Sequence, residues 1–126
     1  HEETLKQYRA CVFNVVFHNR DDHAKNFSFL MSEKGEWHVS PAYDLTFSSG
    51  PNGEHSTTVS GEGRAPSLTH LMRLAESADI KKQTAYEIIE SVQAASSSWS
   101  SISKAAGVSA ASKQLIEKQF LIKTKL

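Results

Sequence analysis

The stretch NRDDHAKNFSFL, residues 19–30, and the segment SPAYDL, residues 40–45, decide how this sequence is interpreted. The first part, from Asn19 to Asn26, is too rich in short polar side chains to continue a helix, so a loop is expected there. Apolar residues then alternate with polar ones on either side of the turn Glu33-Lys34-Gly35. This alternation predicts a short β-hairpin over residues 27–40, with Asp44 just beyond it.

The spacing of three polar residues points to phosphoryl transfer. Asn26 comes five positions after Asp21, and Asp44 follows the predicted hairpin. Phosphoryl transfer needs a carboxylate that orients or deprotonates the attacking hydroxyl, and oxygen ligands that hold magnesium against the phosphates. Protein kinases place these groups on two loops in this order. We therefore expect Asp21 to be the base and Asn26 and Asp44 to be the metal ligands.

These two segments together resemble the signature of HipA-like serine/threonine kinases of bacterial toxin-antitoxin modules. The resemblance continues through SLTHLMRLAESADI, residues 67–80. It implies that residues 1–126 form the C-terminal, mainly helical (α+β) lobe of such a kinase, with a small hairpin carrying the catalytic and metal-binding loops. It also implies Mg²⁺ and ATP as cofactors, a protein hydroxyl as substrate, and an antitoxin or repressor protein as partner.

The resemblance assigns roles to individual residues. Asp21 would be the catalytic aspartate, and Asn26 and Asp44 the magnesium ligands. His23 and Lys25 match positions of the family motif, where they would brace the loop or approach the phosphate oxygens of the nucleotide. Kinases commonly have Asp-Phe-Gly at the second loop, whereas Asp44 is followed here by Leu45 and Thr46. A glycine-dependent flip of that segment is therefore not expected.

The residues on either side of the two loops predict their packing. Apolar residues at helical spacing predict a buried helix ending near His18, and Cys11 is expected to be a core residue of that helix. Residues 48–67 are dominated by Ser, Gly, Pro, Asn and Thr, so a mobile or ligand-ordered loop is expected. Trp37 and Trp99 are expected to be packing anchors.

The remaining sequence predicts helices. Two apolar stripes indicate them, and their members are Leu68, Leu71, Met72 and Ala75 for the first, and Ala85, Ile88, Ile89, Val92, Trp99 and Ile102 for the second. Asp79 is expected to cap the second of these helices. Gly107 is expected to end it, and Ser109 to open a last helix followed by the basic tail Lys123-Thr124-Lys125.

Composition limits the classes of partner. The 14 basic and 14 acidic residues cancel, so the overall charge does not indicate a nucleic-acid groove or an anionic membrane surface. The single cysteine cannot form an internal disulfide, which suits a reducing, cytoplasmic compartment. Neither a bilayer-spanning apolar stretch nor a secretory signal pattern is present. We expect no direct contact with nucleic acid or membrane.

Two other functions stay open at this point. One is a metal-dependent hydrolase that would use Asp21, Asp22, His23 and Asp44. The other is a non-enzymatic interaction module that keeps the shape of the lobe. For Asp22 alone, a solvent-facing or backbone-capping role is favoured over catalysis, and the histidines other than His23 are expected to be structural or exposed.

Kinases also need a part that clamps the nucleotide. The sequence before Asn19 contains neither a glycine-rich loop nor a strand lysine for the α- and β-phosphates, because it is predicted to be helical. The family carries that lobe upstream, so the chain resembles a fragment or a shortened member. We expect these 126 residues alone to transfer phosphate poorly or not at all.

Overall fold

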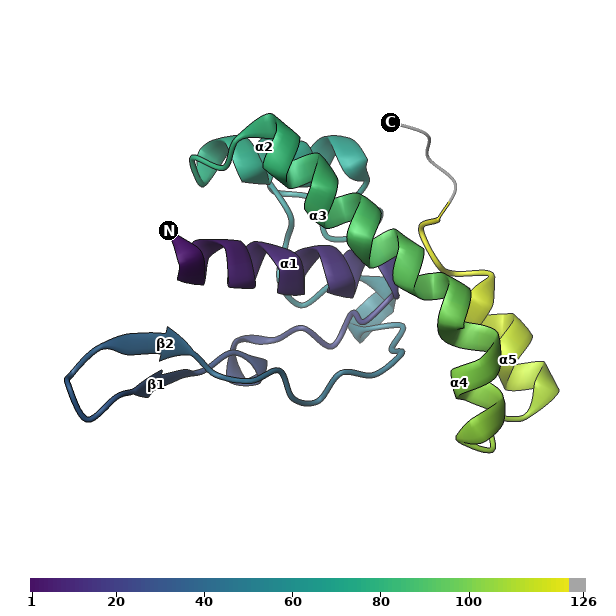
Figure 1. The fold of residues 1–126 in the computed structure, drawn as a ribbon. Helices are drawn as coiled ribbons and strands as arrows, with labels where there is room; N and C mark the ends of the chain where they lie inside the picture. Colours follow the sequence, from purple (N-terminus) through teal and green to yellow (C-terminus); the bar gives the residue numbers. More distant parts are fainter. Residues whose placement is uncertain (123–126) are drawn as a thin grey trace.

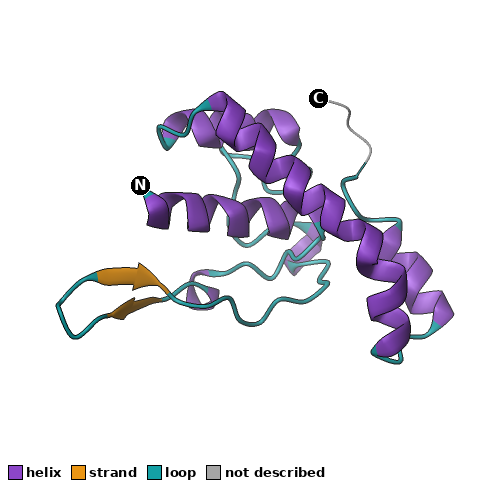
Figure 2. Ribbon diagram, viewed as in Figure 1, coloured by secondary structure: helices purple, strands orange, loops and turns teal. Residues whose placement is uncertain are grey.

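The computed structural model describes residues 1–122 and is mainly helical, with a two-stranded antiparallel hairpin (Figures 1 and 2). This confirms the predicted α+β class. The helices are α1 (Glu2–Val16), α2 (Leu68–Ser77), α3 (Lys82–Ala95), α4 (Trp99–Ala105) and α5 (Ala110–Glu117), and the strands are β1 (Phe29–Met31) and β2 (Trp37–Val39). Short 3₁₀ helices occur at Ala24–Asn26, Pro51–Gly53 and Ser96–Ser98.

Helix α1 lies between the hairpin on one side and α2 and α3 on the other (Figure 1). Its buried face carries Tyr8, Val12 and Val16, which agrees with the predicted apolar stripe. The Tyr8 hydroxyl donates to the carbonyl of Leu71 in α2 at 3.2 Å. Burial of this polar group is therefore compensated by a hydrogen bond between two core helices.

The core joins α1, α2 and α3. Leu71 and Ile89 are fully buried, and Ala75, Ala85, Ile88 and Val92 are buried beside them, as the two predicted stripes require. Cys11 packs against this core, and burial raises the pKa of its thiol to about 12. A thiol with such a pKa stays protonated near neutral pH, so Cys11 fits the predicted core role and not that of a nucleophile.

The hairpin is confirmed, with Phe29 opposite Val39 and Met31 opposite Trp37. Pairing extends to Ser40, whose backbone N–H donates to the carbonyl of Ser28 at 3.0 Å. The prediction that Trp37 is a packing anchor is wrong, because this side chain is 63% exposed. Alternation along a strand predicts a buried face only where a second layer covers the sheet, and here five of the six strand residues stay exposed.

The loop of residues 48–67 reaches the core despite its polar composition. Val59 is 1% exposed and belongs to the core cluster, and His55 is also buried. The backbone N–H of His55 donates to the carbonyl of Gly63 at 2.8 Å. The mobility of the loop stays a prediction, but two of its side chains are anchored in the interior.

The predicted starts and ends of the C-terminal helices are confirmed in part. Gly107 has φ +72 and follows Ala106, the C-cap residue of α4. The Ser109 hydroxyl accepts from the N–H of Ser112 at 3.1 Å and caps α5. Asp79 does not cap α3: it has φ +54, and Lys81 occupies the N-cap position without a side-chain hydrogen bond. That prediction is wrong because the chain turns at Asp79 and the helix starts three residues later.

The apolar stripe predicted beyond α3 is interrupted at Ser96–Ser98. Trp99 packs edge-on against Phe120 with ring centroids 5.6 Å apart, so its predicted anchoring role is confirmed. Ile102 is 60% exposed, and its assignment to the stripe is wrong because the 3₁₀ turn changes the helical phase. The basic tail Lys123-Thr124-Lys125 lies outside the described residues. Within residues 1–122, the helices lack the combination of length and apolar character that crossing a membrane requires.

Candidate active site

The loop that carries the predicted catalytic residues begins where α1 ends. His18 adopts φ +58, which turns the chain sharply out of the helix. The buried side chain of Asn19 then donates from Nδ2 to Asn14 Oδ1 at 3.0 Å, and its backbone N–H donates to the carbonyl of Asn14 at 2.9 Å. These bonds fix the start of the loop to the last turns of α1.

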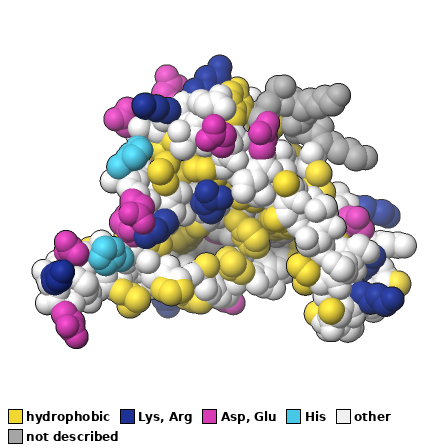
Figure 3. All heavy atoms as spheres, viewed as in Figure 1, with side chains coloured by type: hydrophobic (Ala, Val, Ile, Leu, Met, Phe, Trp, Pro, Cys, Tyr) yellow, Lys and Arg dark blue, Asp and Glu magenta, His cyan; other side chains and the backbone are white. Residues whose placement is uncertain are grey.

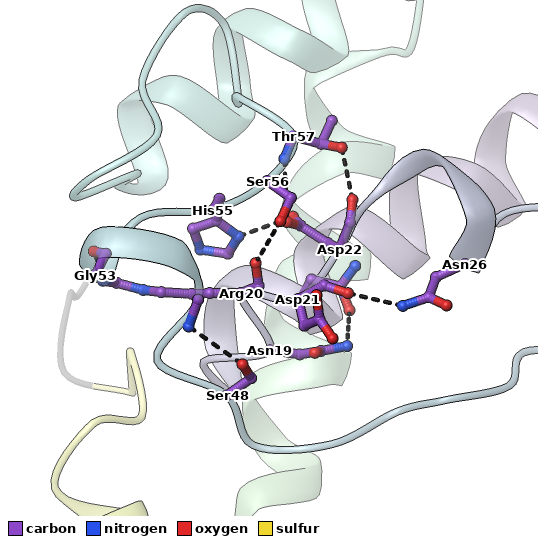
Figure 4. A network of polar contacts seen from close by, with 12 residues as sticks. Asn19, Arg20, Asp21, Asp22, Asn26, Ser48, Gly53, His55, Ser56 and Thr57 are labelled. Carbon is purple, nitrogen blue, oxygen red and sulfur yellow. Dashed lines mark hydrogen bonds and ion pairs between the residues drawn. The ribbon is translucent and has the colours of Figure 1, made fainter.

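Within this loop, Asn26 is tied to Asp21. The Asn26 side-chain Nδ2 donates to the main-chain carbonyl of Asp21 at 2.7 Å (Figure 4). The amide nitrogen is thereby committed to the loop, so the other end of the amide, the acceptor oxygen Oδ1, is directed away from Asp21. An oxygen held in a fixed direction is what a hard cation needs from an asparagine ligand.

The second predicted loop is joined to the first by a tyrosine. The Tyr43 hydroxyl donates to the main-chain carbonyl of Lys25 at 2.8 Å, so the residue before Asp44 is bonded to the residue before Asn26. Asp44 has φ +52, a left-handed conformation that aspartate tolerates better than most residues. Sequence reasoning missed the role of Tyr43, although its position directly before Asp44 was visible.

A cavity of about 350 Å³ lies between α1 and the segment that leaves the hairpin. Asn26 and Asp44 both contribute to its wall, together with apolar residues such as Phe13, Phe27 and Leu45. Figure 3 shows hydrophobic side chains gathered around a hollow in this region. The structure therefore brings the two predicted metal ligands to one cavity, whereas Asp21 is absent from its wall.

The other predicted site residues lie nearer the surface. The Asp21 side chain is 48% exposed, and its Oδ1 lies 3.7 Å from His23 Nε2, which is too long for a hydrogen bond. Lys25 is exposed, and it contributes to the site through its main-chain carbonyl, which accepts from Tyr43. A base must be reachable by the attacking hydroxyl, so the exposure of Asp21 is compatible with that role.

Asp22 points inward and is 5% exposed. Its Oδ2 lies 2.8 Å from His55 Nδ1, and its Oδ1 accepts from the backbone N–H of Thr57 at 3.1 Å. The expected solvent-facing position is thus wrong, whereas the expected backbone-capping role is confirmed. The expectation that His55 is structural agrees with its burial. Sequence analysis missed this pairing because 33 residues separate the two partners.

The electrostatics of the loop are clearest at His18. Burial, with smaller contributions from Arg20 and His55, lowers the pKa of the His18 imidazole from 6.5 to about 4. The ring also stacks on Phe47, with centroids 5.4 Å apart. His18 is therefore neutral at physiological pH and joins the first loop to the segment that follows Asp44.

Comparison with known protein families gives one result. Residues 1–99, which include both loops, the hairpin and all of α1, α2 and α3, match the HipA-like C-terminal domain. The chain belongs to this family. Membership confirms the resemblance seen in the two sequence segments. The HipA-like C-terminal domain is a kinase-family domain, which implies the use of ATP. No match was found among curated proteins.

The residues at the cavity fit magnesium. Mg²⁺ prefers oxygen ligands and usually takes only one or two carboxylates together with phosphate oxygens and waters. The amide of Asn26 and the carboxylate of Asp44 form such a small oxygen set at one cavity, so they fit this ion. By contrast, the set named for a hydrolase is divided, because Asp22 and Asp44 line the cavity whereas Asp21 and His23 do not. Both Asp22 oxygens are also engaged, by His55 and Thr57. Among residues 1–122, no three His, Cys, Asp or Glu side chains gather as a metal-holding group.

Proposed function

We propose that this chain supplies the base and the metal ligands of a HipA-like serine/threonine kinase, which transfers a phosphoryl group from Mg-ATP to a protein hydroxyl. The observation that supports it best is the hydrogen bond from Asn26 to the Asp21 carbonyl, which directs the amide oxygen away from the loop beside a cavity that Asp44 also lines. A base and two metal ligands are thereby carried on connected loops, as phosphoryl transfer requires.

Each residue has one task in this proposal. Asp21 accepts a hydrogen bond from the substrate hydroxyl and orients it, and its partial exposure leaves room for a protein segment. Asn26 and Asp44 hold Mg²⁺, which when bound neutralises charge on the phosphates. Tyr43 keeps the two loops together through the Lys25 carbonyl. His23 and Lys25 lie near Asp21 and Asn26 in the chain, and we propose that they steady the loop or approach phosphate oxygens.

We further propose, from the family resemblance, that a nucleotide-clamping lobe outside these 126 residues completes the enzyme, and that an antitoxin or repressor protein is its partner. Incubation of the chain alone with labelled ATP, Mg²⁺ and a protein substrate should give little or no phosphoprotein. Strong transfer by the chain alone would contradict the need for such a lobe and would leave the assignment of Asp21 to be tested by Asp21→Asn.

The metal assignment can be tested without any enzymatic activity. Mn²⁺, a paramagnetic substitute for Mg²⁺, should broaden the NMR signals of residues around Asn26 and Asp44. Asn26→Ala and Asp44→Asn should each weaken Mn²⁺ binding about tenfold or more, because each removes or neutralises one oxygen ligand. Asn at position 44 keeps the tolerance for positive φ, so the backbone is preserved.

Asp79→Asn is the matched control. Asp79 is also an exposed aspartate with positive φ, at +54, but it lies outside the cavity wall. Mn²⁺ affinity should be unchanged in this variant. If Asp79→Asn weakened binding as much as Asp44→Asn, the ion would be held by general negative charge and the assignment of Asp44 would be wrong.

A further inference from the structure

We propose that Asp22 and His55 form a buried clamp. It holds the later loop, residues 48–63, against the first catalytic loop, residues 19–26, and thereby positions Asn26. This inference rests on the proposed function for its meaning, because it assigns Asp22 a positioning role in that site. The contacts that make up the clamp do not depend on catalysis. These contacts come from both side chains and backbone (Figure 4).

The side chains of the clamp are almost fully enclosed. The exposed fractions are 2% for the His55 side chain and 6% for that of Asp22, and His55 Nδ1 lies 2.8 Å from Asp22 Oδ2. A carboxylate can only accept hydrogen bonds, so the His55 Nδ1 carries the hydrogen in this pair. Both Asp22 oxygens are engaged, because the second accepts from the Thr57 N–H. A buried charge with this many partners is costly to disturb.

Backbone contacts continue the clamp in both directions along the chain. The Arg20 N–H donates to the carbonyl of Ser48 at 3.2 Å, and the Arg20 carbonyl accepts from the N–H of Ser56 at 3.1 Å. The Thr57 hydroxyl donates to the main-chain carbonyl of Asp22 at 2.6 Å. The first catalytic loop is therefore held between two parts of the later loop, residues 48 and 56–57.

The two loops approach so closely that one position requires glycine. Gly50 has φ +70, and a Cβ atom added there would lie 2.7 Å from the Cβ of Arg20 and 2.0 Å from the carbonyl oxygen of Glu54. The Arg20 guanidinium also donates to the carbonyl of Gly53. Val59, 1% exposed, anchors the following segment in the core. The later loop is thus fixed at its core end and can act as a support for the first loop.

The clamp reaches the metal-facing amide through a short path. His55 holds the side chain of Asp22, which directly follows Asp21 in the chain. The Asp21 carbonyl in turn accepts from Asn26 Nδ2 at 2.7 Å. A shift of the backbone at Asp22 would move that carbonyl and release the amide. Asp22 is therefore a positioning residue, and His55 acts through it.

The test uses NMR hydrogen exchange on the 126-residue chain without metal or nucleotide. His55→Ala and Asp22→Ala should each speed exchange of the Thr57 backbone amide and of the Asn26 side-chain amide about tenfold, since each leaves a buried polar partner unsatisfied. In the double variant these amides should exchange only slightly faster than in either single variant, because both substitutions break the same interaction. His55→Asn, whose amide can still donate to Asp22, should restore much of the protection.

His38→Ala is the matched control. His38 is another histidine beside an acidic residue, 3.7 Å from Glu3, but its side chain is 48% exposed and lies on the hairpin. Exchange at Thr57 and Asn26 should not change in this variant. Core amides of Leu71 and Ile89, measured in the same spectra, show whether each variant stays folded.

The outcomes separate the clamp from the proposed function. Unchanged exchange at Asn26 in His55→Ala, additive effects in the double variant, or failure of His55→Asn to restore protection would each overturn the clamp. If His55→Ala also loses protection of the core amides, His55→Asn decides whether the clamp is correct. A donor at position 55 must then restore protection both in the core and at Thr57 and Asn26. Absence of Mn²⁺ binding by the unchanged chain would count against the kinase proposal and would leave the exchange result standing.

Discussion

At the scale of the residue, two adjacent aspartates with the same chemistry have opposite environments. Asp21 has a half-exposed side chain, whereas Asp22 is buried and fully hydrogen-bonded. The difference comes from their surroundings, because His55 and Thr57 approach Asp22 from a loop more than 30 residues away. The two carboxylates are thus distinguished by their partners and not by residue type.

His18 should make folding stability depend on pH. The unfolded chain protonates this ring near pH 6.5, whereas the folded chain keeps it neutral down to about pH 4. The unfolded state therefore binds the proton first, and the contribution of His18 is present above pH 6.5 and is lost as the pH falls toward 4. Because the ring is only part-buried, solvent screening limits the effect to about 1 kcal/mol.

This pH dependence can be measured by urea unfolding at pH 7 and pH 5. The unchanged chain should lose about 1 kcal/mol more than His18→Asn between the two values. Asparagine tolerates the φ of +58 at this position and does not titrate. An equal loss in both proteins would show that other groups account for the pH dependence.

At the scale of the element, the hairpin is held by its turn and by contacts with α1. Gly35 has φ +79 in the turn, and nothing lies within 4 Å of a Cβ that would be added there. The Val39 N–H donates to the carboxylate of Glu3, which ties β2 to the start of α1. The strands themselves are short and exposed, so local backbone preference has a larger share in their stability than burial.

Gly35→Ala should open the hairpin more readily. Alanine at positive φ costs about 1 kcal/mol, so exchange of the paired amides of Ser32 and Ser40 should rise about fivefold. Gly35→Asn should have a smaller effect because asparagine accepts this conformation more easily. Equal acceleration by both substitutions would mean that the loss of glycine flexibility, and not the sign of φ, controls the hairpin.

At the scale of the whole molecule, stability is concentrated where α1, α2 and α3 meet, at one side of the candidate site (Figure 1). Aromatic contacts join the far end, with α4 and α5, to α1 and its C-cap. The Phe120 ring centroid lies 4.9 Å from that of Phe17 and 5.6 Å from that of Trp99. The first site loop leaves from the C-terminal end of α1, and the second leaves from β2. We therefore expect the core to act as the rigid support of the site.

Ile89→Ala should lower the free energy of unfolding by about 3 kcal/mol, because it leaves a cavity at a fully buried position. Ile102→Ala removes the same atoms from a side chain that is 60% exposed and should cost less than about 0.5 kcal/mol. Chemical denaturation followed by circular dichroism measures both. Similar losses in the two variants would contradict the location of the core.

The helical class, the hairpin, the family and the core stripes could all be predicted from the sequence, because they follow from local periodicity and from a motif with fixed spacing. The same local rules failed at Trp37, Asp79 and Ile102, where burial or capping depends on what packs nearby. Only the tertiary structure brought Asp22 to His55 and placed Asn26 and Asp44 on one cavity. Contacts between residues far apart in the chain leave no periodic signal, so packing alone decided them.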